Sequence, residues 1–430
     1  MRYHSTSNTE QNVGLHDAVL RSVAPDGGVY MPDFIPLIPR ALFNHIPEMS
    51  LHEIAFVVGN TLFGTDIPAE TINSIIRETL TFDIPLVKVD DNIFALELFH
   101  GPTGSFKDVG ARFMARLVKH LTETETSAGP TINVFVATSG DTGCAVSHGF
   151  AGIKGLRVFV FHPKGNLLRV PHASFRSPSS NIIPVGLRGS FDDCQAIVRR
   201  IYNDPELNRR MNITSANSIN IARLLPQTFY YFHAYARLLS QCENPGKIVI
   251  STPCGNLGNL TAAIFSLQLG LPIDRILAAG HDNERLWGVI MDQRLTLNDF
   301  NSNAMSTNLA RINDLISANK SLADIIECHT YNDSLVAEQI VNTYRRSAYL
   351  MDRNSAMACR ALGESLRPGE SGIFLATAHP EKYAVRLREL LGNDILAGDT
   401  AYGTDRTIPS ETILPALFPA VKRFLLEQDN

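Results

Sequence analysis

The chain has 430 residues, of which 44% are hydrophobic and 19% are charged, so it is long enough for two or three packed units with a substantial core. Its 38 basic and 43 acidic residues leave a net charge of −5 without a basic stripe or a run of like charge. This balance argues against nucleic acid or an anionic membrane as a partner and favours a small-molecule metabolite.

The six cysteines are widely scattered and include no CxxC pair, so neither a disulfide framework nor a zinc site is expected. No uninterrupted apolar stretch reaches the roughly 20 residues that a bilayer-spanning helix requires. The residues after Met1 also lack the apolar core of a signal peptide. We therefore expect a cytoplasmic protein that binds no metal.

Residues 1–85 are predicted to form a mostly helical N-terminal domain. Apolar residues recur there at helical spacing, as Leu51, Ile54 and Val58 illustrate, and no strong strand pattern is present. The hydrophobic pattern changes in residues 86–430, where buried strands are predicted at 132–136, 156–161, 247–251, 275–279 and 372–376. Strands that alternate with helical patterns indicate parallel sheets covered on both faces, whose ligands bind at the carboxyl ends of the strands.

Lys107 is the first candidate for chemistry. A Gly/Pro-rich turn at residues 101–104 places it at the start of a predicted helix that continues to Val118. The positive end of a helix dipole disfavours a cation, which suits an amine that must become neutral to act as a nucleophile or form an imine. The alternative is an exposed lysine beside Asp108 that merely begins a helix.

Two loops between a strand and a helix are candidates for anion binding. Residues 137–143 (Ala-Thr-Ser-Gly-Asp-Thr-Gly) supply hydroxyls and N–H groups at a helix N-terminus, with a simple cap by Ser139 or Asp141 as the alternative. Residues 252–260 carry Gly255 and Gly258 in a pattern typical of a phosphate cradle. The third glycine of a dinucleotide fingerprint and the Gly-Lys-Ser/Thr of a Walker loop are both missing from this segment.

A hydroxyl at the end of the last clear strand is the fourth feature. Thr377 follows the predicted strand 372–376 and could hydrogen-bond to a ring nitrogen, although alone it is an ordinary strand-end residue. One phosphate cradle combined with one isolated lysine indicates a phosphorylated aldehyde cofactor better than a nucleotide.

These features, in this order, resemble the tryptophan-synthase-like fold (fold type II) of pyridoxal-phosphate enzymes. They are a Lys-Asp at a helix start, a Ser-Gly-x-Thr-Gly loop, a Gly-Asn-x-Gly-Asn loop and a strand-end Thr. Four longer strings resemble the threonine synthase family of the fungal and enterobacterial type, namely residues 96–103, 137–143, 214–223 and 377–380. The resemblance covers nearly the whole chain, including residues 27–32 near its start.

The resemblance implies pyridoxal 5′-phosphate as the cofactor, held as a Schiff base on the catalytic Lys107. The remaining cofactor-binding residues would be Gly255, Asn256, Leu257, Gly258, Asn259, Thr377 and Asp141. The substrate-binding residues would be Ser139, Gly140 and Thr142 for a carboxylate, and Arg112, Lys164, Asn217 and Arg223 for a phosphate. The alternative for the 139–142 loop is contact with the phenolic edge of the cofactor.

The resemblance also implies an architecture and a reaction. The N-terminal domain would be followed by two α/β lobes, a smaller one at about 107–190 and a larger one formed by the remainder, with the cofactor between them. The reaction would convert O-phosphohomoserine and water to threonine and phosphate by γ-elimination and β-addition, which makes the protein a lyase acting on a small-molecule amino-acid substrate.

Three segments depart from the family pattern, and all belong to the substrate half of the site. They are residues 166–173, 306–308 and 352–354; the loop before Lys107 also carries Gly104-Ser105, a pairing more typical of related β-replacement enzymes. Two alternatives therefore stay open. One is a lyase of this type that acts on a different phosphorylated or acylated amino acid, and the other is a homologue that binds the cofactor without turnover.

Overall fold

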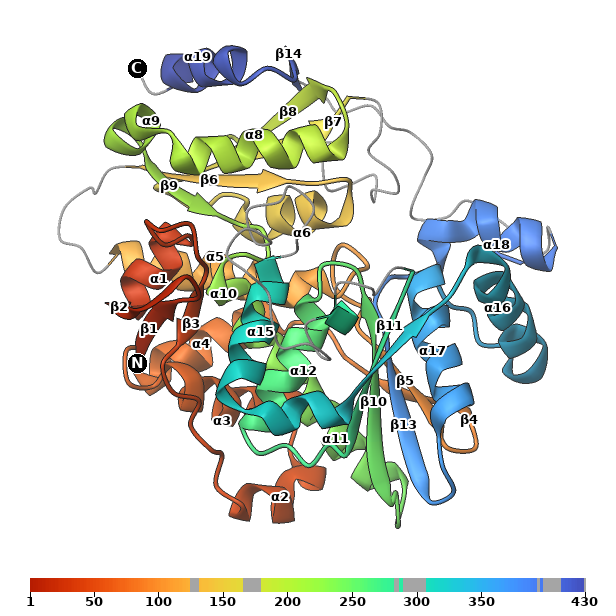
Figure 1. Ribbon diagram of the computed structural model, residues 1–430. Helices are drawn as coiled ribbons and strands as arrows, with labels where there is room; N and C mark the ends of the chain where they lie inside the picture. Colours follow the sequence, from red (N-terminus) through yellow and green to blue (C-terminus); the bar gives the residue numbers. More distant parts are fainter. Residues whose placement is uncertain are drawn as a thin grey trace.

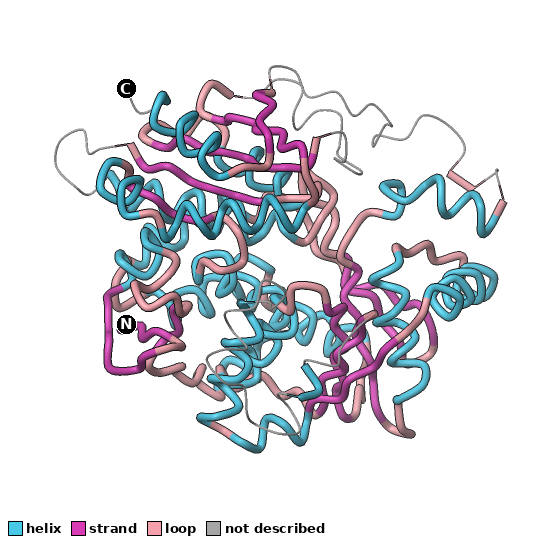
Figure 2. Tube along the Cα trace, turned by 45° about the horizontal axis from the view of Figure 1, so that its top comes forward, coloured by secondary structure: helices cyan, strands magenta, loops and turns pink. Residues whose placement is uncertain are grey.

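A computed structural model describes residues 1–123, 131–164, 179–281, 286–288, 307–392, 395–396 and 411–428 (Figure 1). Two groups of parallel strands with helices on their faces follow an N-terminal region, which confirms the predicted fold class. Figure 2 shows the two groups as separate sheets. The proposed division of the chain into domains stays a prediction.

The N-terminal region corrects the expectation that it lacks strands. It contains a small antiparallel sheet in the order β2-β1-β3, formed by β1 (Arg2–Ser5), β2 (Asn8–Gly14) and β3 (Tyr30–Pro32). These strands are short and β2 is polar, so no apolar run reveals them. The helices of this region are α1 (Leu15–Arg21), α2 (Ala41–His45), η1 (Ile46–Glu48), α3 (Leu51–Phe63) and α4 (Ala69–Thr79).

A six-stranded sheet in the order β12-β11-β10-β13-β5-β4 forms the larger layer. Only β4 runs antiparallel to its neighbour. Its strands are β4 (Leu86–Asp90), β5 (Ile93–Glu97), β10 (Lys247–Cys254), β11 (Arg275–Gly280), β12 (Ile326–Thr330) and β13 (Glu370–Ala376).

Helices cover both faces of the larger sheet, as the alternation within β10 shows. Ile248 and Ile250 pack into the core that contains α11 (Thr228–Gln241) and α12 (Gly258–Gln268). Val249 points to the opposite face and packs with α16 (Asp333–Ser347) and α17 (Arg353–Ser365). Because successive side chains of a strand alternate between faces, a strand buried on both faces becomes a continuous apolar run. The other elements around this sheet are α10 (Ile221–Leu224), η2 (Leu225–Gln227), α15 (Thr307–Ala318), η3 (Lys320–Ile325), η4 (Pro380–Tyr383) and α18 (Ala384–Leu391).

A five-stranded parallel sheet in the order β14-β8-β7-β6-β9 forms the smaller layer, at the top of Figure 1. Val134 and Val158 face the core shared with α5 (Lys107–Glu123) and α6 (Asp141–Phe150), whereas Phe159 and its neighbours face α8 (Phe191–Asn203) and α19 (Phe418–Gln428). The strands are β6 (Ile132–Ala137), β7 (Leu156–Pro163), β8 (Ile182–Arg188), β9 (Asn212–Ser215) and β14 (Thr412–Pro415), and α9 (Pro205–Arg210) precedes β9.

The smaller sheet extends beyond the range 107–190 that the sequence suggested for its lobe. Both β9 and β14 lie outside that range, and β14 comes from the C-terminal end of the chain. Neither four-residue strand carries a long apolar run, so the sequence pattern does not indicate them. The five strands that the sequence did predict are β6, β7, β10, β11 and β13.

No helix in the described ranges is long and apolar enough to cross a membrane. Among these residues there is likewise no group of three or more His, Cys, Asp or Glu side chains that could hold a metal ion.

Gly110 sits at a close contact between α5 and α10. A Cβ placed on Gly110 would lie 2.6 Å from the backbone oxygen and 3.2 Å from the Nε of Arg223. Backbone cannot retreat as a side chain can, so any larger residue at 110 must push the two helices apart. This contact fixes the distance between the start of α5, which carries Lys107, and the segment that carries Arg223.

We predict that Gly110→Ala lowers the free energy of unfolding by roughly 1–3 kcal/mol, the usual cost of overpacking a core. Urea unfolding followed by circular dichroism measures the change. The matched control is Gly363→Ala in α17, where a Cβ would meet no atom within 4 Å. There the better helix propensity of alanine should stabilise the protein by up to about 1 kcal/mol. Equal stability of the two variants would contradict the close approach.

Candidate active site

The loop before Lys107 is shaped by the buried carboxylate of Asp108. One oxygen accepts the backbone N–H of Thr103 at 2.9 Å, and the other accepts the Thr103 hydroxyl at 2.7 Å. Gly101 has to be a glycine, because a Cβ there would lie 2.5 Å from the Asp108 carboxylate. Gly104 has a φ of +61°, in the left-handed region that glycine occupies without strain. Asp108 is therefore a structural residue of this turn.

Backbone hydrogen bonds tie the loop to the end of β13. The N–H of Phe106 donates to the Thr377 oxygen at 3.0 Å, and the N–H of His379 donates to the Gly104 oxygen at 3.0 Å. The chain here adopts a short antiparallel bridge between Ser105 and Ala378. As a result, Lys107 at the start of α5 lies beside the carboxyl end of a central strand of the larger sheet.

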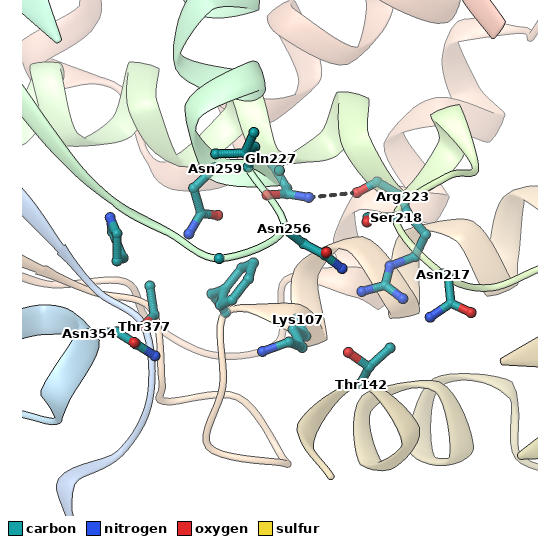
Figure 3. Close-up of a pocket in the computed structure, with 15 residues that line it drawn as sticks. Lys107, Thr142, Asn217, Ser218, Arg223, Gln227, Asn256, Asn259, Asn354 and Thr377 are labelled. Carbon is teal, nitrogen blue, oxygen red and sulfur yellow. Dashed lines mark hydrogen bonds between the residues drawn. The ribbon is translucent and has the colours of Figure 1, made fainter. Parts of the chain in front are cut away.

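One pocket brings together most of the residues that the sequence suggested (Figure 3). The lining residues come from the starts of α5, α6 and α17 and from the carboxyl end of β13. Others come from the loop between β10 and α12 and from the segment between β9 and η2. Those predicted from sequence are Lys107, Thr142, Asn217, Arg223, Gly255, Asn256, Leu257, Gly258, Asn259 and Thr377. Those that sequence reasoning did not place in the site are Phe106, Ser218, Gln227, Pro253 and Asn354.

Lys107 points its amine into this pocket, where its side chain keeps 24% exposure. Burial lowers the pKa of Lys107, and the positive charges of Lys382 and Arg223 act in the same direction, whereas Asp141 opposes the shift. The Nζ lies 3.6 Å from Oδ2 of Asp141. The position at a helix start, which the sequence marked as unfavourable for a cation, therefore coincides with a site that favours the neutral amine.

Asp141 faces the lysines and does not cap its helix, contrary to the simple alternative raised for this loop. The helix α6 has Gly140 at its N-cap position without a side-chain cap. The hydroxyl of Thr138 accepts the N–H groups of Gly140 at 2.9 Å and of Gly143 at 2.8 Å instead. Burial acts to raise the pKa of Asp141, but Lys107 and Lys382 outweigh it, so the pKa is lowered and the carboxylate is ionised.

The glycine-rich loop at the start of α12 fits an anionic group. Leu257 adopts the left-handed conformation with φ of 56°, which for a residue other than glycine costs on the order of 1–2 kcal/mol. A Cβ on Gly255 would meet no atom within 4 Å, so this backbone borders open space. The loop is anchored from outside, since Asn308 donates to the Asn256 oxygen at 2.7 Å and the Tyr231 hydroxyl donates to the Asn259 oxygen at 2.7 Å.

Arg223 is a buried cation that borders the pocket. Its Nη1 donates to the Ala216 oxygen at 2.5 Å, and its Nε is buried without a hydrogen-bond partner. Within the described residues Arg223 forms no ion pair, and burial lowers its pKa to about 10. A buried guanidinium with an unpaired donor destabilises the folded protein unless an anion binds to it. This side chain therefore marks an anion site.

Arg112 does not belong to the pocket, which corrects its prediction as a ligand of a substrate phosphate. Its Nε donates to the Thr79 oxygen at 2.8 Å and its Nη2 donates to the Glu78 oxygen at 2.7 Å. The guanidinium therefore fastens α5 to the C-terminal end of α4. The prediction failed because five residues along a helix turn about 140° away from Lys107.

The other suggested substrate residues have mixed positions. Asn217 lines the pocket, but its amide exchanges hydrogen bonds with the backbone of Ala137 at 3.0 and 2.9 Å, so it also holds this segment to β6. Ser139 is exposed and Gly140 is buried beside Thr142, yet neither lines the pocket. Lys164 is exposed and also lies outside it. The departing segments 166–173 and residue 306 lie outside the described residues.

Asn354 is the most informative of the pocket residues that sequence reasoning missed. It lies in the first turn of α17, where the Asp352 carboxylate accepts its backbone N–H at 2.7 Å. The side chain of Asn354 is placed beside Thr377 (Figure 3). The sequence did contain a signal for Asn354. Residues 352–354 depart from the family pattern, and such a departure can indicate a residue that borders the substrate.

The pocket fits pyridoxal phosphate. The open backbone at Gly255 and the start of α12 suit its phosphate, and the partly buried amine of Lys107 suits its aldehyde. Thr377 lines the pocket at the strand end, where its neutral hydroxyl would suit a ring nitrogen. A model of the pyridoxal-phosphate-dependent enzyme family matches residues 74–389. Fold, pocket and match together define a pyridoxal-phosphate-dependent enzyme.

The N-terminal region narrows the class, since a model named for the threonine synthase N terminus matches residues 2–80. A threonine synthase of Haemophilus influenzae is 35% identical over 400 residues, which cover 91% of this chain and 92% of that protein. The chain belongs to the threonine synthase family of pyridoxal-phosphate-dependent lyases.

Solved structures agree with this assignment. Threonine synthase from Escherichia coli superposes with a TM-score of 0.87 at 30% identity, with 100% of both chains covered. The threonine synthase of Brucella melitensis, whose structure contains bound pyridoxal phosphate, superposes with a TM-score of 0.82 at 27% identity, again over 100% of both chains.

We predict that borohydride reduction of the purified protein fixes the cofactor on Lys107 and bleaches its visible absorption. Lys107→Ala should lose the reducible label and the turnover, because no other amine replaces the one at the start of α5. Peptide mass spectrometry locates the label. Lys119→Ala, on the exposed end of the same helix, should keep both. A label on a different lysine in Lys107→Ala would contradict the assignment.

Proposed function

We propose that this enzyme converts O-phosphohomoserine and water to threonine and phosphate. The family assignment supports the reaction class, and the substrate is inferred from the chemistry of the pocket. The observation that carries the inference is Arg223, a buried guanidinium that borders the pocket with an unpaired Nε and no carboxylate partner among the described residues. A phosphorylated substrate would supply the missing anion, and arginine suits phosphate because its donors form a planar fork.

The cofactor would be held at both of its polar ends. Backbone N–H groups of Gly255, Asn256, Leu257, Gly258 and Asn259 would bind its phosphate, and Thr377 would face its ring nitrogen. When bound, pyridoxal phosphate supplies the electron sink that makes protons on the substrate carbons removable. A threonine hydroxyl leaves this sink weaker than an aspartate partner would, because it carries no charge.

Lys107 would carry the protons. As a neutral amine beside the substrate, it can accept the proton from Cα and then the one from Cβ, after which phosphate leaves from Cγ. A proton then returns to Cγ to form the methyl group, and the hydroxyl of water adds at Cβ. The same amine can return a proton to Cα before threonine is released. Burial of Lys107 supports this role, since it lowers the pKa toward the range where the amine exchanges protons at neutral pH.

The substrate carboxylate would bind at the start of α6. Thr142 borders the pocket there, and the Ser139 hydroxyl and the first N–H groups of α6 would add donors nearby. Asn217 would face the same side of the substrate as Arg223. With the carboxylate held near α6 and the phosphate near Arg223, the amino group would be directed toward Lys107 between them.

A lyase that acts on a different phosphorylated amino acid is the second candidate. Asn354 favours it, because this residue borders the pocket in a segment that departs from the family pattern. Incubating the protein separately with O-phosphohomoserine, homoserine and O-phosphoserine, and measuring phosphate and amino-acid products, separates the two candidates. Threonine and phosphate from O-phosphohomoserine alone support the first, and products from O-phosphoserine alone support the second.

We predict that Arg223→Ala lowers kcat/KM for O-phosphohomoserine roughly ten- to a hundredfold, or about 1.5–3 kcal/mol, through loss of a charge-assisted contact. Visible absorption by the cofactor should survive. Arg223→Lys should recover part of the loss because it restores the charge without the planar fork.

Arg112→Ala is the informative comparison for Arg223→Ala. It should lower the free energy of unfolding by roughly 1–3 kcal/mol, because the Thr79 and Glu78 oxygens lose their donor. It should leave KM nearly unchanged. If Arg112→Ala raised KM as much as Arg223→Ala, the separation between a structural and a substrate-binding arginine would be wrong.

A further inference from the structure

Asp141 is shared by two lysines, of which only Lys107 borders the pocket. Lys382 in η4 donates from its Nζ to Oδ1 of Asp141 at 2.8 Å, while Oδ2 of the same carboxylate lies 3.6 Å from the Nζ of Lys107. The side chain of Lys382 is only 1% exposed, compared with 24% for Lys107. The shorter and more buried contact of the Asp141 carboxylate is therefore with Lys382, which does not border the pocket.

Both lysines lie near Asp141 because their segments meet at the carboxyl end of β13. After β13, the chain passes Thr377 and turns into η4, which carries Lys382. The loop before Lys107 is bonded to this strand end through Phe106 and Thr377. Two lysines that are 275 residues apart in sequence thus hold their amines near one carboxylate of α6.

A carboxylate alone beside Lys107 would hinder its chemistry. An opposite charge within a few ångströms stabilises the ammonium form and raises the pKa of a lysine by about one to three units. The amine could then neither react with an aldehyde nor accept a proton near neutral pH. A second ammonium on the same carboxylate offsets this attraction, so that a proton can leave Lys107 for the solvent.

We propose that Lys382 is a positioning residue that holds the Asp141 carboxylate from its buried side and thereby releases Lys107 into its neutral, reactive form. The inference rests on the proposed role of Lys107 and is independent of which substrate the enzyme uses.

The charged groups around Lys107 support this assignment. Burial is the main factor that lowers the pKa of Lys107; Asp141 opposes it, and Lys382 and then Arg223 add to it. Two further buried carboxyl groups lie on adjoining elements. Asp108 of α5 is bound by Thr103, and Asp352 before α17 is bound by the Ser355 hydroxyl and backbone N–H groups. Burial raises the pKa of both, which leaves Asp141 as the carboxylate that acts on Lys107.

The pKa of Lys107 can be measured directly in the full-length chain after removal of the cofactor. Competitive labelling with acetic anhydride across a pH series, read by peptide mass spectrometry, gives the fraction of neutral amine at Lys107. We expect Lys382→Met to raise this pKa by about one unit, whereas Lys382→Arg should leave it near the wild-type value because the charge is retained. Lys422→Met is the matched control, since Lys422 forms ion pairs with Asp204 and Glu206 in the smaller lobe and should have no effect.

Asp141→Asn supplies an independent measurement if Lys382→Met fails to fold. It should lower the pKa of Lys107, and adding Lys382→Met to it should change the pKa by less than Lys382→Met does in the wild type. The proposal is overturned if Lys382→Met, folded by circular dichroism, leaves the pKa of Lys107 unchanged or lowers it, or if Asp141→Asn does not lower it. Because the labelling uses neither cofactor nor substrate, failure of the proposed reaction would not affect this result.

Discussion

The short backbone bridge between the Lys107 loop and the end of β13 is the constraint on which the site depends. Two hydrogen bonds of 3.0 Å, from Phe106 to Thr377 and from His379 to Gly104, join the start of α5 to the larger sheet. The α5 helix packs with α6 against the smaller sheet, so this bridge also connects the two lobes. Backbone bonds of this kind do not depend on side-chain identity, and they set the separation of Lys107 from Thr377 more rigidly than side-chain contacts would.

The N-terminal region is linked to residues of the pocket through α15. Arg311 in this helix is fully buried and binds backbone oxygens of Tyr30 in β3 and of Ser218 and Ile219 beside the pocket. One turn earlier, Asn308 donates to the oxygen of Asn256 in the glycine-rich loop. The N-terminal region contributes no residue to the lining of the pocket, but it thus supports the loop proposed to hold the cofactor phosphate. This support gives the N-terminal region of the family a physical role in the site.

Sequence reasoning succeeded where the determinants are local. Strands buried on both faces become apolar runs, so β6, β7, β10, β11 and β13 could be recognised, and the glycine-rich loop follows directly from one of them. It failed where a residue acts through a tertiary contact. Arg112 lies five residues after Lys107 but faces α4. Lys382 reaches Asp141, and Asn354 reaches the pocket, from segments more than two hundred residues away from Lys107. Only the folded chain places them.

The balance of charge in the pocket explains why these buried cations are tolerated. The chain as a whole carries a net charge of −5, so the positive groups around the pocket are a local arrangement. Lys382 is offset by Asp141, but Arg223 has no carboxylate partner among the described residues. The loop before α12 adds backbone at Gly255 that borders open space. Burying such groups is unfavourable in the empty protein and becomes favourable when anions bind. A phosphorylated cofactor would supply the anion at the start of α12, and a phosphorylated substrate would supply the anion at Arg223. Binding of both ligands should therefore stabilise the folded chain.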